Sequence, residues 1–459
     1  MRFLSKTISA LLAAASMTAL FAGCGKTSEE TVKVNVWTPD SHSKSVMLEL
    51  VDEWNKTKGR ELGVEIVYTV KEGDIQQATE MAFASDQGPD LFSSVLIEKN
   101  RTAGNIVPLD ELEGGQEWID SMFEPGDYDG PAFKGDDGKV YCLPRNVNAF
   151  GLVYNKDMFK KYGIVDENGE PTPPETFEEL REYAKRMTDP AAQDYGIIFP
   201  MKWNAFYSAD VAQLLIGSTG KNHFDCVTGE FNLDGLKPIY EMYLGIKEDG
   251  SCFPGSESLD NDMARAYFAE RNIGMKFAGS YDVGVFNNQF PAKCDWGVAP
   301  YPVADKNNKY LQHMGVGGWM ALSTGAREKL GDAKALEVLK FFYGEDMQKR
   351  LFAEGMALPF NAEIAEGVEI KEGLKGWKEF NEIVKISTGG YTLASFDLTG
   401  EKGPQTVFME DIWTGNVSVD DAISDLNTRL NAGMKKFYRN NPDKDFQKLL
   451  KPDWDIKRD

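Results

Sequence analysis

The residues of this sequence best suited to chemistry are aromatic side chains that stand beside polar ones where predicted strands end. Three places have this form: Trp37 with Asp40, Trp203 with Asn204, and Ser280-Tyr281-Asp282; Trp319, which follows Gly317-Gly318, is a further aromatic candidate. An aromatic face stacks on apolar C–H groups, while carboxylate and amide groups hydrogen-bond to hydroxyls. These pairs predict the recognition of a ligand that carries both kinds of surface.

Sugar rings have such surfaces, and the chain has nine Trp and seventeen Tyr, enough for several stacking platforms. Most of these aromatic side chains are expected in the core. Trp54, for example, lies on the apolar stripe of a predicted helix, and we assign it to packing. Trp37 differs because it ends a predicted strand and opens the loop Thr38-Pro39-Asp40-Ser41, where open α/β folds place their ligands.

No complete catalytic motif accompanies these residues. The patterns G-x-S-x-G, H-E-x-x-H and G-x-G-x-x-G after a strand are absent. Gly25-Lys26-Thr27 resembles the end of a phosphate-binding loop, but Leu20 stands where that loop needs a glycine. Because 72 Asp and Glu residues guarantee chance carboxylate pairs, an anchored extracellular glycosidase stays open as an alternative. We predict a binding protein and not an enzyme.

Metal-ligand patterns are missing as well. Three His residues and no C-x-x-C pair exclude a multi-histidine centre and a zinc ribbon. The acidic turns Asp127-Tyr128-Asp129-Gly130 and Asp136-Asp137-Gly138 suggest a calcium loop, but the EF-hand register would put Pro125 at the first ligand position. We therefore expect surface turns there, and predict no metal and no cofactor.

Length and charge bound the remaining classes. A chain of 459 residues with 42% hydrophobic and 27% charged residues is globular and favours two or more domains. Its net charge of −22 repels phosphate backbones, so we predict no nucleic-acid partner. The four cysteines other than Cys24 are Cys142, Cys226, Cys252 and Cys294. We expect them either to be isolated thiols or to include a disulfide, for which Cys226 and Cys252 are the pair nearest in sequence.

The first residues predict export. Arg2 and Lys6 precede the apolar run Ile8 to Ala22, which is too short to span a bilayer but suits a signal peptide. The run ends in Leu20-Phe21-Ala22-Gly23-Cys24, which resembles a bacterial lipobox with Phe21 in place of the usual leucine. We predict a signal peptide at 1–23, diacylated Cys24, a polar tether at 24–30, and a location on the extracytoplasmic face of the cell membrane. An ordinary secretory signal with a chance cysteine is the alternative.

Strand and helix patterns alternate along the rest of the chain. Val32, Val34 and Val36 alternate with polar residues and predict a strand. Residues 43–58 carry apolar side chains at helical spacing, which predicts a helix that Gly59 can end, and 64–70 predicts a second strand. This βαβ order favours a parallel sheet covered by helices, an α/β fold.

Further elements follow the same logic. Asp74 to Ser85 has helical periodicity, and Thr176-x-x-Glu179 is a capping box that opens a helix. Residues 332–343 predict another helix, while 195–199 and 273–277 read as strands.

A series of segments resembles, in order, the extracellular solute-binding proteins of bacterial carbohydrate ABC importers, the group that contains maltose-binding-type proteins. The segments are Val34-Asn35-Val36-Trp37, Gly88-Pro89-Asp90-Leu91, Asn105-Ile106-Val107-Pro108-Leu109, Tyr141-Cys142-Leu143-Pro144 with Tyr154-Asn155-Lys156-Asp157-Met158-Phe159, Thr176-Phe177-Glu178-Glu179-Leu180, Gly279-Ser280-Tyr281-Asp282, Gly297-Val298-Ala299-Pro300 with Gly317-Gly318-Trp319-Met320-Ala321, and Gly355-Met356-Ala357-Leu358-Pro359. Each is weak alone, but their order covers nearly all the predicted mature chain.

The resemblance implies a two-lobed periplasmic-binding-protein-like fold of type II, with a ligand cleft between discontinuous lobes and hinge crossovers. By resemblance, the N-terminal lobe takes 31–148 and 303–352, and the C-terminal lobe takes 149–302 and 353–459. Repeated crossings of the hinge let such lobes rotate as rigid bodies.

The resemblance also implies the function. The chain would capture an extracellular carbohydrate, more readily an oligosaccharide than a single sugar, and deliver it to the transmembrane subunits of an ABC permease. We expect a monomer held at the membrane by the lipid on Cys24. Polyamines, metal ions, phosphate and peptides are the alternative solutes, and an acidic cleft would suit a polyamine.

The resemblance places twelve residues in segments that reach the cleft: Trp37, Asp40, Asp90, Arg145, Asn146, Asn148, Trp203, Asn204, Ser280, Tyr281, Asp282 and Trp319. The aromatic rings would stack on sugar faces, and the charged and amide groups would hold hydroxyls. For Asp90, after Gly88-Pro89, a structural turn carboxylate is the competing interpretation.

Overall fold

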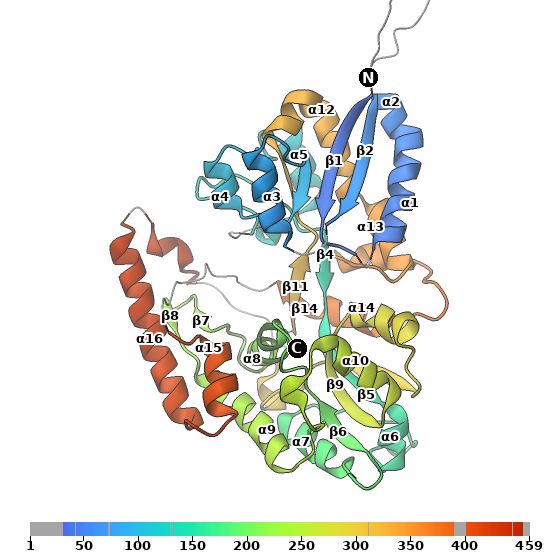
Figure 1. Cartoon of the computed structure of the whole chain (residues 1–459), viewed down its shortest axis with the longest axis vertical. Helices are drawn as coiled ribbons and strands as arrows, with labels where there is room; N and C mark the ends of the chain where they lie inside the picture. Colours follow the sequence, from blue (N-terminus) through green and yellow to red (C-terminus); the bar gives the residue numbers. More distant parts are fainter. Residues whose placement is uncertain are drawn as a thin grey trace, which may run out of the picture.

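The computed structural model describes residues 31–41, 43–71, 74–128, 130, 132–310, 312–389, 401–442 and 444–452. The predicted signal peptide, Cys24 and the tether lie outside the described residues. Figure 1 shows two bodies stacked along the long axis of the molecule, and we call them the upper and lower lobes as they stand there.

The upper lobe is built on a four-stranded sheet of order β12-β3-β1-β2. Its strands are β1 (Val32–Thr38), β2 (Val64–Val70), β3 (Leu91–Ser93) and β12 (Met320–Leu322). β1 pairs in parallel with β2 and β3, and β12 runs antiparallel to β3. The covering helices are α1 (Lys44–Trp54), α2 (Arg60–Leu62), α3 (Ile75–Ala84), α4 (Ile97–Thr102), α5 (Gly115–Met122), α12 (Thr324–Tyr343) and α13 (Glu345–Ala353). The predicted βαβ unit is confirmed, and its valines face a core that α12 helps to close.

The helix after β1 is longer than predicted. Gly59 was expected to end it, but the chain continues through a π-helical turn η1 (Asn55–Gly59) and α2, and ends at Gly63 with φ +65°. A Cβ at Gly59 would lie 2.6 Å from the Val64 carbonyl oxygen and 2.7 Å from the Trp54 ring. Gly59 thus serves close packing, and the left-handed backbone that stops a helix falls on Gly63.

The lower lobe has its own sheet, of order β10-β5-β9-β6. The strands are β5 (Phe150–Asn155), β6 (Tyr195–Ile198), β9 (Ile273–Gly279) and β10 (Trp296–Ala299). Neighbouring residues face opposite cores, as Leu152 and Val153 do, so both faces of the sheet are covered. The helices are α6 (Lys156–Lys161), α7 (Phe177–Arg186), α8 (Ala212–Thr219), α9 (Lys237–Glu248), α10 (Asn261–Glu270), α11 (Asp282–Gly284) and α14 (Trp377–Lys385). The capping box at Thr176 and Glu179 is confirmed.

A small sheet joins the lobes. Its order is β13-β4-β11-β14, with β4 (Asn146–Asn148), β11 (Gln312–Gly317), β13 (Leu358–Pro359) and β14 (Ser387–Gly389). Figure 1 places β4, β11 and β14 in the waist between the two bodies. The lobes are discontinuous because the chain passes this waist repeatedly, so the two-lobed α/β architecture expected above is confirmed.

The chain returns from the lower lobe to the upper lobe later than residue 303, the boundary expected from the resemblance. Val303 N–H bonds to the Glu175 carbonyl at 3.0 Å, and Tyr310 N–H bonds to the Gly217 carbonyl at 2.9 Å, both in the lower lobe. The chain leaves the lower lobe only in β11. The other lobe boundaries, at 148 and 352, stay predictions.

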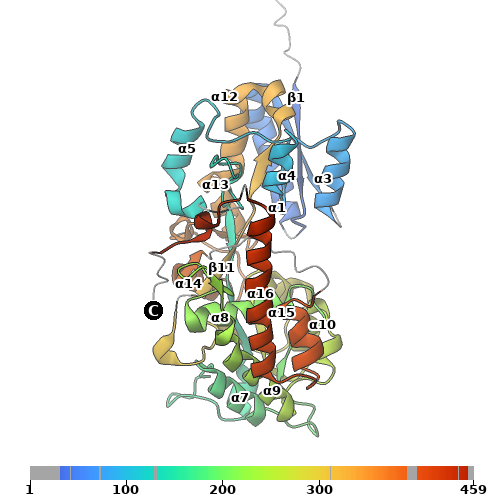
Figure 2. The same cartoon turned by 90° about the vertical axis from the view of Figure 1, so that its left-hand side faces the viewer.

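The C-terminal part of the described chain forms a separate layer on the lower lobe. It contains α15 (Pro404–Thr406), the π-helical turn η9 (Val407–Ile412) and α16 (Val419–Asn440), beside the hairpin β7 (Phe224–Asp225) and β8 (Glu230–Phe231). Figure 2 shows α16 running lengthwise along this flank of the molecule.

Cys142, Cys226, Cys252 and Cys294 are free thiols, so the suggested pairing of Cys226 with Cys252 is not made. Within the described ranges, no helix combines the length and apolarity needed to cross a bilayer.

Candidate functional site

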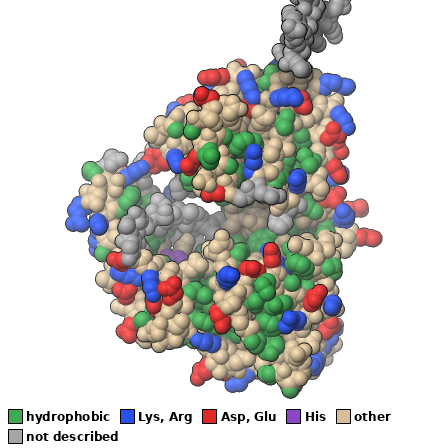
Figure 3. All heavy atoms as spheres, viewed as in Figure 1, with side chains coloured by type: hydrophobic (Ala, Val, Ile, Leu, Met, Phe, Trp, Pro, Cys, Tyr) green, Lys and Arg blue, Asp and Glu red, His purple; other side chains and the backbone are tan. Residues whose placement is uncertain are grey.

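Strand ends of the two lobes meet around the waist, and Figure 3 shows the surface hollowed between the lobes at this level. The upper side of this region centres on Arg145, which is only 4% exposed. Its Nη2 donates to Asp40 Oδ2 at 3.1 Å, although the two residues are 105 positions apart. Its backbone N–H bonds to the Gly317 carbonyl at 3.3 Å, which fixes it beside β11.

Asp40 and Arg145 lie together with Asn146 of the waist strand β4, and we call this group the upper corner. Its packing depends on Gly318. This glycine has φ +70°, and a Cβ there would lie 1.9 Å from Asn146 Oδ1 and 2.7 Å from Arg145 Nε. Both of those atoms are buried and have no hydrogen-bond partner among the described residues. The backbone at Gly318 thus comes close to one donor and one acceptor, neither of which has a hydrogen-bond partner among the described residues.

Two predicted aromatic residues flank the upper corner with different surroundings. Trp319 is half-buried and meets Phe133 edge to face, with ring centroids 6.2 Å apart. Trp37 lies inside β1 rather than after it, packs on the upper core, and has Lys71 Nζ 3.7 Å from its ring centroid. A ligand stacking on that face of Trp37 would displace Lys71.

Tyr68 of β2 lies beside the upper corner and was missed by the sequence analysis. Burial raises its pKa to about 12, with the charge of Arg145 acting against that shift and the charge of Asp40 adding to it. It falls within the predicted strand 64–70, and nothing in the sequence distinguishes it from a packed tyrosine.

Asp90 does not join this corner. It lies immediately before β3, where its carboxylate accepts from the Asn35 backbone N–H at 2.6 Å and from Lys329 Nζ at 2.6 Å. The carboxylate is 8% exposed, and its hydrogen bonds are made with residues of β1 and α12. The structure therefore places Asp90 as a turn carboxylate that ties the upper sheet to a helix.

The lower side begins where β4 passes into β5. Asn148 pairs with Gly315 of β11, and Phe150 follows with its ring 3.3 Å from the position of a Gly315 Cβ. Phe150 and Tyr281 then meet edge to face, with centroids 6.5 Å apart. Phe150 is half-exposed and was missed because it reads as the first apolar residue of a strand.

Ser280 and Asp282 bond to other groups of the chain itself. Ser280 N–H donates to the Ala149 carbonyl at 2.8 Å, and its hydroxyl accepts from the Ala149 N–H at 3.3 Å. Asp282 is 1% exposed and accepts from Arg265 Nε at 2.6 Å, with Lys276 Nζ 3.7 Å away. Ser280 thus secures the crossover and Asp282 anchors two cations, while Tyr281 between them keeps a partly exposed ring.

Asp210 and Lys276 are buried charged residues, close enough to Asp282 for their charges to interact, and the sequence analysis missed them as well. Lys276 Nζ donates to the Phe277 carbonyl at 2.7 Å, and burial lowers its pKa although Asp282 and Asp210 act against that shift. Asp210, on the π-helical turn η3 (Tyr207–Val211), has an Oδ2 with no hydrogen-bond partner among the described residues. Burial raises the pKa of Asp210 to about 7.

Trp203 and Asn204 occupy a turn after β6. Trp203 N–H bonds to the Pro200 carbonyl at 2.9 Å, and the half-buried ring packs on the lower core while Asn204 is exposed. The structure thus brings Asp40 and Arg145 together with Asn146 of the waist strand β4, and on the lower lobe it brings Phe150 together with Tyr281. Aromatic faces and open hydrogen-bonding atoms on facing lobes can hold a ligand by stacking and by hydrogen bonds, without bond-making chemistry.

Comparisons with known proteins agree with this geometry. The chain is 28% identical over 310 residues to a maltotriose-binding protein of Pyrococcus abyssi (strain GE5 / Orsay), a match that covers 67% of this chain and 62% of that protein. It is 27% identical over 194 residues to the maltodextrin-binding protein MdxE of Bacillus subtilis (strain 168), covering 40% and 42%. The chain thus spans less than two thirds of the length of these relatives.

A solved structure shares the fold. The GacH receptor of Streptomyces glaucescens, whose structure was determined unliganded and with acarbose, superposes with a TM-score of 0.68 at 19% identity over 89% of this chain and 99% of the receptor. The sequence also matches the family of bacterial extracellular solute-binding proteins over residues 38–349. Two lobes joined by a strand waist, with this match over more than half of its length, show that the chain belongs to the bacterial extracellular solute-binding proteins.

Proposed function

We propose that this protein binds an oligosaccharide between its two lobes and delivers it to the membrane subunits of an ABC importer. The family consists of binding proteins, and the relatives named above carry maltotriose and maltodextrin in their names. Closure of the lobes around a ligand that contacts both would give the permease a form to recognise.

The observation that carries the proposal is the open pair of atoms beside Gly318. Arg145 Nε is a donor and Asn146 Oδ1 is an acceptor, and both are buried without a partner among the described residues. Leaving such a group unpaired costs about 1–3 kcal/mol. A hydroxyl can donate to one and accept from the other, so neighbouring hydroxyls of a sugar would satisfy both atoms at once.

The same pair disfavours charged solutes. An anion could accept from Arg145 but would be repelled by the lone pairs of Asn146 Oδ1, and Asp40 already neutralises the guanidinium. A polyamine would face the ammonium group of Lys71 beside Trp37. These contacts favour a neutral polyol over phosphate or spermidine-like cations.

An enzymatic role finds little support in the same residues, and we propose that the protein is not an enzyme. A glycosidase needs two available carboxylates flanking a bound sugar. Asp40 is held by Arg145, and Asp282 is held by Arg265 and Lys276. We further propose, from the N-terminal sequence, a monomer on the extracytoplasmic face of the cell membrane, anchored through lipid on Cys24.

Tryptophan fluorescence titrated with maltotriose, raffinose, spermidine and inorganic phosphate tests the ligand class. We expect a saturable change with a neutral oligosaccharide, and an affinity loss of about 1–3 kcal/mol in Trp203→Ala or Trp319→Ala. Trp54→Phe, in the upper core, is the matched control and should bind as the parent does. Saturable binding of spermidine or phosphate alone would contradict the sugar assignment, and release of shortened sugars from the panel would favour the glycosidase.

A further inference from the structure

Residues 401–452, which we call the arm, are built onto the lower lobe. The apolar side of α16 enters the lower core through Ile423, Leu426 and Leu430. Figures 1 and 2 show α16 lying along the flank of that lobe, beside β7 and β8, and reaching up toward the level of the upper lobe. The arm therefore moves with the lower lobe.

Two asparagines on α16 fix its register. Asn431 Oδ1 accepts from the Phe231 N–H and its Nδ2 donates to the Phe231 carbonyl, both at 2.9 Å. One turn earlier, Asn427 Oδ1 accepts from the Leu233 N–H at 2.8 Å. Side chains that bond to a strand edge in this way leave the helix little freedom to slide or rotate.

The chain beyond α16 folds back onto the same hairpin. Tyr438 and Phe446 meet edge to face with centroids 5.2 Å apart, and Lys451 N–H bonds to the Cys226 carbonyl at 2.9 Å. Lys444 lies between these contacts, and its own N–H bonds to the Asn441 carbonyl at 3.0 Å. Its backbone is thus held by the lower lobe.

The side chain of Lys444 reaches the other lobe. Its Nζ forms an ion pair with Asp136 Oδ2, across 308 positions of sequence. Asp136 stands in a tight turn of the upper lobe, where its N–H donates to Glu98 Oε1 at 2.6 Å, and Glu98 in turn pairs with Arg101 of α4. Both ends of the ion pair are therefore mounted on fixed backbone, one in each lobe.

We propose that the Lys444–Asp136 ion pair is a latch between the arm and the upper lobe, which holds the lobes together on the side of the cleft away from the waist strands. The lobes can separate there only if this pair breaks. The latch would act on the solute site proposed above by slowing the escape of ligand, and in this respect the inference rests on the proposed function.

The expected effect is modest and depends on salt. The two side chains are 40% and 53% exposed, and exposed ion pairs change an equilibrium by up to about fivefold. Because the Debye length shrinks from about 10 Å at 0.1 M to about 3 Å at 1 M salt, the latch should weaken over that range.

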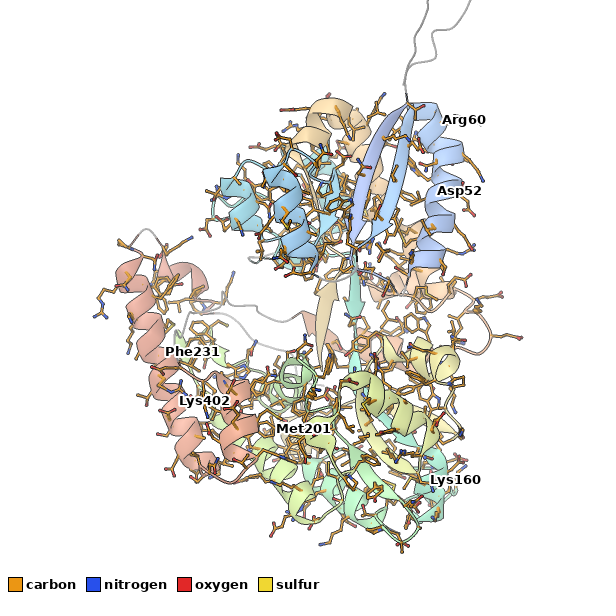
Figure 4. All side chains as sticks on the ribbon, in the orientation of Figure 1. Asp52, Arg60, Lys160, Met201, Phe231 and Lys402 are labelled. Carbon is orange, nitrogen blue, oxygen red and sulfur yellow. The ribbon has the colours of Figure 1, made fainter. Side chains whose placement is uncertain are left out.

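The test compares Lys444→Glu with Lys436→Glu, which makes the same charge change at an exposed position of α16. Fluorophores on noncanonical residues at positions 60 and 160 report the distance between the lobes; Figure 4 labels Arg60 on the upper lobe and Lys160 on the lower one. We expect Lys444→Glu, without ligand, to shift the distances away from those of the wild type and to raise the release rate of maltotriose up to about fivefold at 0.1 M salt. Lys436→Glu should do neither.

Charge reversal completes the test. Combining Lys444→Glu with Asp136→Lys should restore both the distances and the release rate. Equal behaviour of Lys444→Glu and Lys436→Glu in both measurements, or failure of the double variant to restore them, would overturn the latch. Because the distances are read without ligand, a protein that binds no oligosaccharide would refute the proposed function and leave the latch to be decided by the distances alone.

Discussion

Replacing Asp210 with asparagine should change how the stability of the protein depends on pH. The carboxyl is 2% exposed, and its Oδ2 has no hydrogen-bond partner among the described residues. Burial raises its pKa to about 7; the charge of Lys276 acts against that shift and the charge of Asp282 adds to it. Asparagine has nearly the same shape and cannot lose a proton in this range.

The size of the effect follows from linkage. In the unfolded chain this carboxyl loses its proton near its ordinary pKa of 3.8, whereas in the folded protein it keeps the proton up to about pH 7. The folded state therefore holds more protons between these values, and stability falls as pH rises through this window. Each pH unit is worth 1.36 kcal/mol, so the wild type should lose about 2–3 kcal/mol between pH 5 and pH 8 through this group.

Urea unfolding at pH 5, 6, 7 and 8 measures this loss. The free energy of unfolding of Asp210→Asn minus that of the wild type should increase by about 2–3 kcal/mol from pH 5 to pH 8. Asp74→Asn, at an exposed helix N-cap, serves as the control and should show no such trend. A difference between Asp210→Asn and wild type that stays constant with pH would refute the assignment of a buried, protonated Asp210.

Three other substitutions give sharp expectations. Gly318→Ala should lower the free energy of unfolding by about 1–3 kcal/mol, seen as a lower melting temperature, and should weaken ligand binding. The φ of +70° and the 1.9 Å approach of a Cβ to Asn146 Oδ1 leave no room for a side chain there. Asn431→Ala should lower the free energy of unfolding by about 1–3 kcal/mol and speed hydrogen exchange at Phe231, which loses the two hydrogen bonds that Asn431 makes with its backbone. Burial lowers the pKa of His223 to about 4, so the wild type should lose about 1–3 kcal/mol as pH falls from 6.5 to 4, and His223→Gln should lose less.

Matched controls separate these effects from general loss of structure. Gly325→Ala places a Cβ in open space and should change the free energy of unfolding by no more than about 0.5 kcal/mol, as neutral surface substitutions do. Asn440→Ala, exposed on α16, should leave exchange at Phe231 unchanged. Equal behaviour of either control and its partner variant would contradict the contact assigned to that partner.

Local features of the fold could be predicted because their causes are local. The alternation of Val32, Val34 and Val36 is sufficient for a strand with one buried face, and the Thr176 capping box needs only four consecutive residues. Even the error at Gly59 was local in origin. Its sequence signal is that of a helix stop, but the Trp54 ring packed against it decides what the glycine is for.

The candidate site could be predicted only in part. Asp40, Arg145 and Asn146 do come together, yet the ion pair between the first two joins positions that no local pattern connects. Trp37 carries the right chemistry in the sequence, but Lys71 over its ring is a product of two neighbouring strands in the fold.

Asp282 shows most clearly where sequence reasoning stops. Its type and its place at a strand end suited a ligand contact, and the resemblance placed it in the cleft. The folded chain surrounds it instead with Arg265 and Lys276 and leaves it 1% exposed. The sequence by itself determined the local elements that carry a clear periodicity or cap, such as the strand at Val32 to Val36 and the helix that Thr176 caps. The tertiary structure alone decided which polar side chains are neutralised by others and which keep open atoms for a ligand, because burial and charge pairing depend on residues that only the fold brings within hydrogen-bonding distance.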